Sequence, residues 1–178
     1  VYDALNRMIQ TIEADPDGSG PLTSTITQFR YDAVGNVVET VDGKGNRSRS
    51  TYDTRDRLLS LIDPQGQVTR FEYDVSGNLV NIVDPLGHTT RSVYDSRGRL
   101  TRTTDAEGGV TKFRYDSDDN LLVLTDPVGN RTQFVYDSRS RTLRETDPLG
   151  NSIDYRYDSV DNLVEKTDRN LRVTEFTY

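Results

Sequence analysis

The stretch YDVSGNLVNIVDPLGHTTRSV, from Tyr73 to Val93, is one copy of a 21-residue unit that recurs along most of the chain. Tyrosines return every 21 residues from Tyr31 to Tyr178 without a break. An aspartate follows each of them except Tyr178, which is the last residue. A fixed period in this range indicates a repeat architecture, in which each unit is stabilised by packing on its neighbours.

Two clusters of turn-forming residues divide each unit. If the tyrosine is position zero, Asp-x-x-Gly-Asn covers positions one to five and Asp-Pro-x-Gly-Asn covers positions eleven to fifteen. Pro fixes φ at a turn corner, Gly adopts positive φ, and Asp or Asn side chains bond the local backbone. The segments between them are rich in strand-forming Thr, Val, Leu, Phe and Tyr, and they are too short for helices. The predicted fold class is therefore all-β: tandem hairpin repeats in one continuous curved or spiralling antiparallel sheet.

The odd period restricts the strand register. A three-residue loop in the first cluster pairs position zero with position six, as in Tyr73 and Leu79. If the second turn also held three residues, the pairing would drift by one residue per unit and turn every side chain to the other face. One odd and one even turn, or a β-bulge, removes the drift. We expect the second turn, Pro-x-Gly-Asn, to hold four residues.

This register places positions zero and six on one face, where they form a structural column. Each cross-strand aromatic–aliphatic pair contributes about 0.2–1 kcal/mol, so the column acts through its sum. The opposite face mixes apolar residues such as Leu59 and Val80 with basic ones such as Arg49 and Lys112, so we expect neither face to form a dry core. The column consists of Tyr31, Val37, Tyr52, Leu58, Tyr73, Leu79, Tyr94, Leu100, Tyr115, Leu121, Tyr136, Thr142 (its weakest member), Tyr157, Leu163 and Tyr178.

The domain organisation follows from the same frame: residues 1–178 form a single repeat array. Residues 2–30 are an irregular first unit with eight extra residues, and the insertion near Asp15 to Thr23 (DPDGSGPLT) reads as a loop that leaves the sheet. Residues 31–177 are seven regular units. The last of these has Asp168-Arg169-Asn170-Leu171, without Pro or Gly, so we expect its turn to differ. Because Val1 lies within a repeat, we expect the chain to be a piece of a longer protein.

Composition excludes several classes of function. The chain has 178 residues, a net charge of −7, and no Cys. An acidic balance argues against a nucleic-acid partner, whose phosphates require basic patches. No segment approaches the ~20 apolar residues of a membrane span. The absence of Cys excludes disulfides and thiol chemistry.

Two rows of aspartates are the strongest candidates for metal ligands. Calcium takes six to eight oxygen ligands, but members of one row recur every two strands, about 9.6 Å apart, too far for two carboxylates to share an ion. We expect each aspartate to cap its own turn instead. The first row is Asp32, Asp53, Asp74, Asp95, Asp116, Asp137 and Asp158; the second is Asp42, Asp63, Asp84, Asp105, Asp126, Asp147 and Asp168.

No other constellation predicts chemistry. His88, the single histidine, occupies a turn position held elsewhere by Asn46 and Asn130, so we interpret it as a turn residue. Near-identical repeat environments argue against paired catalytic carboxylates, which need different surroundings. The rows of Tyr and Phe resemble sugar-stacking platforms, although packing within the sheet explains them as well. We expect no catalytic, cofactor-binding or metal-binding residues.

The motif Tyr-Asp-x-x-Gly-Asn/Arg-Leu with a trailing Thr-Asp-Pro-x-Gly-Asn resembles the YD repeat of RHS proteins, over almost the whole chain. Clear copies are YDAVGNVV from Tyr31, YDTRDRLL from Tyr52, YDVSGNLV from Tyr73, YDSRGRLT from Tyr94 and YDSVDNLV from Tyr157. The resemblance implies a long sheet that spirals into a hollow shell, as in RHS toxins, insecticidal toxin complexes and teneurins. The family's self-cleaving segment lies beyond the repeats, and nothing like it occurs here.

The resemblance implies a non-enzymatic wall segment of a shell that encloses and shields a toxin or effector domain. Its partners would be the flanking YD repeats and the enclosed domain, and its location secreted or at the cell surface. The alternative is an extracellular adhesion or carbohydrate-binding module of the teneurin or wall-associated kind, with glycans as partners. A third hypothesis is self-assembly of the segment through its open sheet edges.

Overall fold

The protein is described by a computed structural model that places residues 1–13 and 25–178. All regular elements in these ranges are β-strands. None of the described residues belongs to a helix long and apolar enough to cross a membrane. The chain divides into two compact units, Val1–Thr89 and Thr90–Tyr178. The insertion predicted near Asp15 to Thr23 lies outside the described residues.

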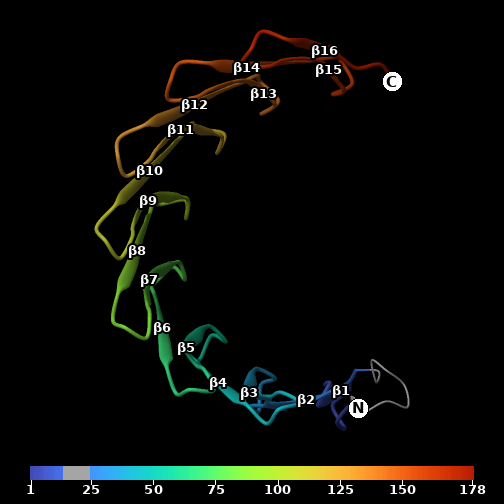
Figure 1. Cartoon of the computed structure of the whole chain (residues 1–178), viewed down its shortest axis with the longest axis vertical. Coiled ribbons are helices and arrows are strands. Elements are labelled where there is room, and N and C mark those ends of the chain that lie inside the picture. Colours follow the sequence, from blue (N-terminus) through green and yellow to red (C-terminus); the bar gives the residue numbers. More distant parts are fainter. Residues whose placement is uncertain (14–24) are drawn as a thin grey trace. The chain divides into compact units, whose positions relative to one another are not determined.

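The strands are short and evenly spaced along each unit (Figure 1). The first unit holds β1 (Gln10–Ile12), β2 (Ile26–Tyr31), β3 (Val37–Val41), β4 (Arg47–Tyr52), β5 (Leu58–Ile62), β6 (Val68–Tyr73) and β7 (Leu79–Val83). β8 (Thr89–Tyr94) starts at the last residue of that unit. The second unit continues with β9 (Leu100–Thr104), β10 (Val110–Tyr115), β11 (Leu121–Thr125), β12 (Arg131–Tyr136), β13 (Thr142–Thr146), β14 (Ser152–Tyr157), β15 (Leu163–Thr167) and β16 (Val173–Glu175).

The sheet topology is the simplest one available to consecutive hairpins. The strands are neighbours in chain order from β1 to β16, within one sheet whose first and last strands are not joined. The described strand pairs are antiparallel, for example β10 with β11 and β11 with β12. The predicted all-β fold of tandem hairpins is confirmed.

The two turns of a unit have the same geometry, so the predicted four-residue second turn is wrong. In the first turn the Asp74 amide donates to the Asn78 carbonyl at 3.0 Å and the Gly77 amide to the Asp74 carbonyl at 3.1 Å. In the second turn the Asp84 amide donates to the His88 carbonyl at 2.9 Å and the Gly87 amide to the Asp84 carbonyl at 3.0 Å. Both are three-residue loops that end in a residue with positive φ, because that conformation matches the twist of the strands.

A β-bulge takes up the odd residue of each unit. Tyr73 lies opposite Leu79, but the next pair is Glu72 with Asn81, so Val80 has no partner across the hairpin. The same shift follows Tyr31, Tyr52, Tyr94 and the later tyrosines. Two odd turns alone would give a repeat of 20 residues, and the unpaired residue of the bulge adds the twenty-first. The repeat therefore stays in register without an even turn.

The last turn also departs from expectation. The Asp168 amide donates to the Arg172 carbonyl and the Leu171 amide to the Asp168 carbonyl, both at 2.9 Å. Leu171 occupies the position of the usual glycine with φ of 61°. A left-handed conformation costs a non-glycine residue roughly 1–2 kcal/mol. The turn thus keeps the common geometry at the expense of strain at Leu171.

The sheet has almost no interior. Among the described residues, Val123 is the one buried apolar side chain, at 5% exposure, and Glu39 is the one buried polar residue, at 8%. The facing residues of neighbouring strands are half-buried rather than covered by a second layer. Stability therefore depends on the backbone ladder, the turns and lateral contacts between side chains of adjacent strands.

Candidate functional site

Both aspartate rows cap turns, as predicted. Asp84 Oδ1 accepts the amides of Leu86 at 2.9 Å and His88 at 2.8 Å, and Asp74 Oδ1 accepts the Asn78 amide at 2.9 Å. Hydrogen bonds from the Arg57 side chain and backbone lower the pKa of Asp53 to about 2. Carboxylates held in this way are ionised acceptors bound to their own loops. No group of three or more His, Cys, Asp or Glu residues in the described chain is arranged to hold a metal.

The residue at position five of each unit alternates between arginine and asparagine. The series is Arg7, Asn36, Arg57, Asn78, Arg99, Asn120, Arg141 and Asn162. The asparagine side chains bond inside their own turn, as Asn78 does with Asp74 Oδ2 at 2.9 Å, and Asn36 also donates to Asp56 Oδ1 of the next unit at 2.9 Å. The arginines also reach the next unit: the Arg57 guanidinium lies 4.6 Å from the Tyr73 ring centroid, and its Nη1 lies 3.4 Å from the Asp74 carbonyl oxygen. The contacts between these arginines and the tyrosines of the next unit therefore recur every 42 residues.

Tyrosine hydroxyls also connect adjacent units. Tyr52 donates to the Val37 carbonyl at 3.0 Å, and Tyr73 donates to the Leu58 carbonyl at 3.1 Å. Tyr136 donates to the Leu121 carbonyl at 3.1 Å. These bonds, with the arginines over Tyr31, Tyr73, Tyr115 and Tyr157, engage the tyrosines within the sheet. They contribute to packing whether or not the rings bind sugars.

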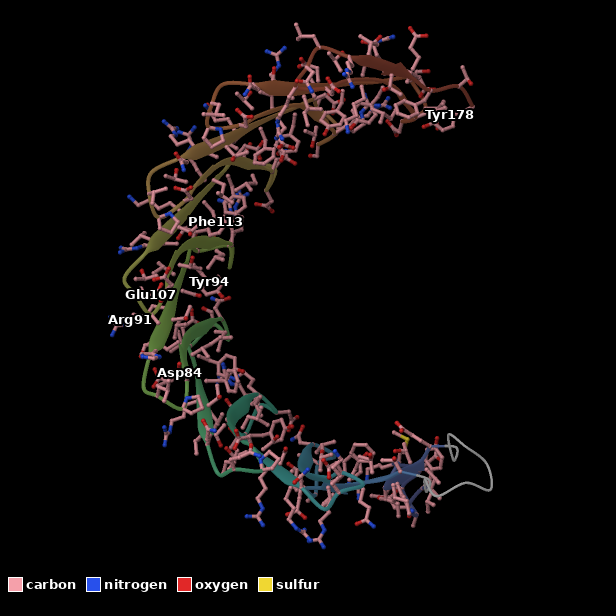
Figure 2. All side chains as sticks on the ribbon, in the orientation of Figure 1. Asp84, Arg91, Tyr94, Glu107, Phe113 and Tyr178 are labelled. Atoms are coloured by element: carbon pink, nitrogen blue, oxygen red, sulfur yellow. The ribbon has the colours of Figure 1, made fainter. Side chains whose placement is uncertain are left out.

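The two faces of the second unit differ sharply in chemistry. Arg91 and Tyr94 project to opposite sides of the ribbon, and Phe113 lies on the side of Tyr94 (Figure 2). The register agrees, since Phe113 lies opposite Leu124, whereas Lys112 lies opposite Arg102. We call the side that carries Lys112 and Arg102 the basic face. Its charged strand residues in this unit are Arg91, Arg102, Lys112, Arg114, Arg131, Arg144 and Arg156, against Asp154, Glu165 and Glu175.

The basic face of the first unit contains an internal counter-ion. Glu39 on β3 lies opposite Arg30 of β2 and Arg49 of β4. Its carboxylate is 2.8 Å from Arg47 Nη1, 3.1 Å from Arg49 Nε and 3.6 Å from Arg30 Nε. The hydrogen bond from Arg49 and the charges of Arg47 and Arg30 outweigh burial and lower the pKa of Glu39. Three arginines thus share one buried carboxylate.

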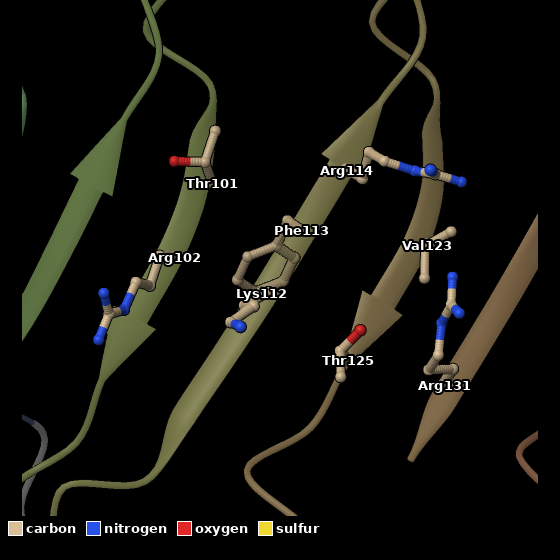
Figure 3. A pocket seen from close by; sticks show the side chains of 8 residues that line it. All are labelled: Thr101, Arg102, Lys112, Phe113, Arg114, Val123, Thr125 and Arg131. Atoms are coloured by element: carbon tan, nitrogen blue, oxygen red, sulfur yellow. The ribbon is translucent and has the colours of Figure 1, made fainter. Parts of the chain in front are cut away.

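The second unit has a hollow in the corresponding place. Val123 on β11 occupies position eight of its repeat, as Glu39 does on β3, and lies opposite Arg114. A hollow of about 420 Å³ surrounds it, lined by Arg102, Lys112, Arg114 and Arg131 among others (Figure 3). In the described chain, none of these four cations has an acidic partner within 4.0 Å.

His88 takes the turn position that its spacing predicted. Its Nδ1 lies 2.8 Å from Asp84 Oδ2, and its side chain is 54% exposed. The predicted column has its hairpin pairs side by side, such as Tyr94 with Leu100 and Tyr115 with Leu121. The energetic role of the column is still a prediction. Sequence reasoning missed the hollow and the 42-residue alternation, although comparing position five in successive units would have revealed the alternation.

Comparison with known proteins supports the repeat assignment. The model of the teneurin YD-shell family matches residues 22–178. No curated protein matches the chain.

Solved structures similar to this chain include toxin-complex proteins. The crystal structure of TcdB2-TccC3-Cdc42 is 15% identical with a TM-score of 0.43, over 100% of this chain and 14% of that chain. A mutant Photorhabdus luminescens Tc holotoxin pore is 15% identical with a TM-score of 0.42, over 99% of this chain and 14% of that chain. The present chain therefore spans about one seventh of their length.

Proposed function

The chain belongs to the teneurin YD-shell family, and from this premise we propose that it is a non-enzymatic wall segment of a shell that encloses and shields a toxin or effector domain. The observation that supports this most is the sheet itself. It is one layer thick, it is paired strand by strand in chain order, and it has both faces accessible. A single paired layer suits a wall, because its backbone polar groups are satisfied laterally and no interior is needed.

The proposed partners follow from the sheet edges and faces. The outer edge of β16 suits pairing with flanking YD repeats, since an exposed edge presents unpaired amides and carbonyls, whereas the outer edge of β1 is already partly bonded to Val1. The enclosed domain would contact one face. We assign no catalytic residue to this segment. We also propose a secreted or extracellular location, in keeping with the family.

The experiment uses the full-length parent protein. Electron cryomicroscopy should show a lumen with density that belongs to a separate domain. Limited proteolysis should leave that domain intact until the shell is opened. A matched pair of deletions sharpens the test: removing residues 94–135, two whole units, keeps the 42-residue alternation, whereas removing residues 94–104 breaks a hairpin. Only the second deletion should expose the enclosed domain to protease. A solid rod, or a parent without any further domain, contradicts the proposal.

The carbohydrate-binding alternative has its own test. Phe113 and Phe134 are half-exposed on the face of the tyrosines and are free of the arginine contacts that cover four of the tyrosines. A glycan array with the wild type and with a Phe113→Ala, Phe134→Ala double variant distinguishes carbohydrate binding from the wall function. Saturable binding lost in the double variant favours adhesion, whereas an array without specific signal leaves the wall function as the explanation.

A further inference from the structure

The hollow around Val123 and the cluster around Glu39 occupy corresponding positions in two hairpins and differ in charge. Both centres occupy position eight, and both have an arginine opposite on the preceding strand, Arg30 or Arg114. Both have an arginine at position sixteen, Arg47 or Arg131, on the following strand. The repeat therefore places two arginines of this frame in both hairpins, around a carboxylate in the first and an isopropyl group in the second. The third partner of Glu39, Arg49, corresponds to Gln133 in the second hairpin, where Arg102 and Lys112 supply the additional charge.

The first copy shows what the frame accepts. The Glu39 carboxylate binds Arg47 through one oxygen and Arg49 through the other, and its side chain is 9% exposed. Charge-assisted hydrogen bonds of this kind are about twice as strong as neutral ones. The geometry of the basic face is thus suited to a carboxylate placed above the middle of a strand.

The second copy has more positive charge and no counter-ion. Arg102 and Lys112 lie opposite each other on β9 and β10, and they add to Arg114 and Arg131. Other arginines of the same unit are paired: Arg144 contacts Asp154 and Arg156 contacts Glu165. Four of the unpaired cations of this face therefore gather at the hollow. The volume of about 420 Å³ is in the range of small ligand sites and accommodates a few side chains.

We propose that the hollow formed by Arg102, Lys112, Arg114 and Arg131 around Val123 binds a glutamate- or aspartate-containing segment of a polypeptide partner. The partner's carboxylate takes the place that Glu39 fills internally in the first unit. The apolar floor provided by Val123 and the methyl group of Thr125 accommodates the aliphatic part of the incoming side chain. The site is independent of whether that partner is an enclosed domain or another protein.

The test uses the whole chain and fluorescein-labelled hexaglutamate, followed by fluorescence anisotropy and calorimetry. We expect saturable binding that weakens at least about tenfold when ionic strength rises to about 0.5 M, because the contacts are ionic. Val123→Glu supplies an internal carboxylate and should weaken binding at least about tenfold. Val75→Glu is the matched control: it changes net charge equally at a turn tip that is 93% exposed, and it should change affinity less than about twofold.

Two further variants keep the test decisive if Val123→Glu perturbs the fold, which amide hydrogen exchange will reveal. Lys112→Gln should weaken binding without adding an acidic group. Glu39→Val should add a second hexaglutamate site per chain, because it empties the frame of the first unit. Hexaglutamine should not bind.

Four results would overturn the proposal. They are no saturable binding at about 1 mM peptide, equal loss in Val75→Glu and Val123→Glu, equal affinity for hexaglutamine, or a sulfated oligosaccharide of equal charge binding ten times tighter. The last result would assign the hollow to a different class of anion.

Discussion

The hairpins of β2–β3 and β10–β11 have the same turns, the same bulge and the same register, yet they differ at one buried position. Glu39 gathers three arginines in the first, whereas Val123 lies beneath unpaired cations in the second. Since the backbone is alike, the repeat fixes where the arginines around position eight lie. The side chain at position eight then determines whether these cations have an internal counter-ion or remain available to a ligand. One substitution in a repeat can therefore create or remove a binding surface without altering the fold.

Acid should have the largest effect on stability. Protonation of Glu39 leaves its arginines without an ionised partner, as the cations around Val123 already are. The pKa of Glu39 lies below its ordinary value of 4.5, and that of Asp53 is about 2. The folded state therefore binds fewer protons than the unfolded chain, so this stabilisation is complete above about pH 4.5 and is lost as pH falls through the folded values. Urea midpoints from pH 7 to pH 2 should fall, with a shallower fall in Glu39→Gln. Parallel curves would show that Glu39 contributes no linkage.

Glu39→Val should be the most destabilising single exchange. It leaves Arg30, Arg47 and Arg49 close together without their shared partner, and we expect the melting temperature to fall by about 5 °C. Glu39→Gln keeps the shape of the side chain and removes its charge, so it should lower the melting temperature by less. Thermal unfolding followed by circular dichroism measures both. An unchanged melting temperature in Glu39→Val would mean that the cluster is electrostatically neutral to folding.

Truncating the apolar partner of a tyrosine should destabilise both hairpins. Leu121→Ala removes a half-buried partner of Tyr115 and should cost about 1–2 kcal/mol, below the cost of a fully buried leucine. Val37→Ala, at the same position opposite Tyr31, should cost about half as much because less side chain is removed. Urea unfolding gives both values. Neither variant should alter hexaglutamate binding; if either does, the two faces are coupled. A negligible cost for Leu121→Ala would argue against the column as a source of stability.

The smallest effects should have opposite signs. Arg49→Gln removes a partner of Glu39 and should lower the melting temperature by about 1–2 °C. Lys112→Gln removes a cation from a hollow without a counter-ion and should raise it by a similar amount. Each exchange removes one cation beside its centre, Arg49 from the strand after Glu39 and Lys112 from the strand before Val123. Equal signs would show that local charge does not distinguish the two hairpins.

Much of the fold was predictable from local sequence. The turn residues at positions one to five and at positions eleven to fifteen predicted the two loops, and the aspartates cap them as expected. The second turn was predicted with the wrong length, because Asp-Pro-x-Gly-Asn is compatible with three or four loop residues and parity alone allowed a bulge as well. The bulge at Val80 and its equivalents leaves no composition signal, since the bulged residue is an ordinary apolar one in most units. The prediction that the turn at Leu171 would differ was wrong for a related reason: the surrounding hydrogen bonds impose a conformation that its residue type disfavours.

The sequence by itself determined the period, the strands, the capped turns and the all-β class, because each depends on residues within a few positions of one another. Only the tertiary structure decided how the odd residue is absorbed and which charges meet. Arg47, Arg49 and Arg30 converge on Glu39 from two different strands, and Arg102 meets Lys112 across a hairpin. Such contacts depend on register, and a shift of one residue would send each of these side chains to the opposite face.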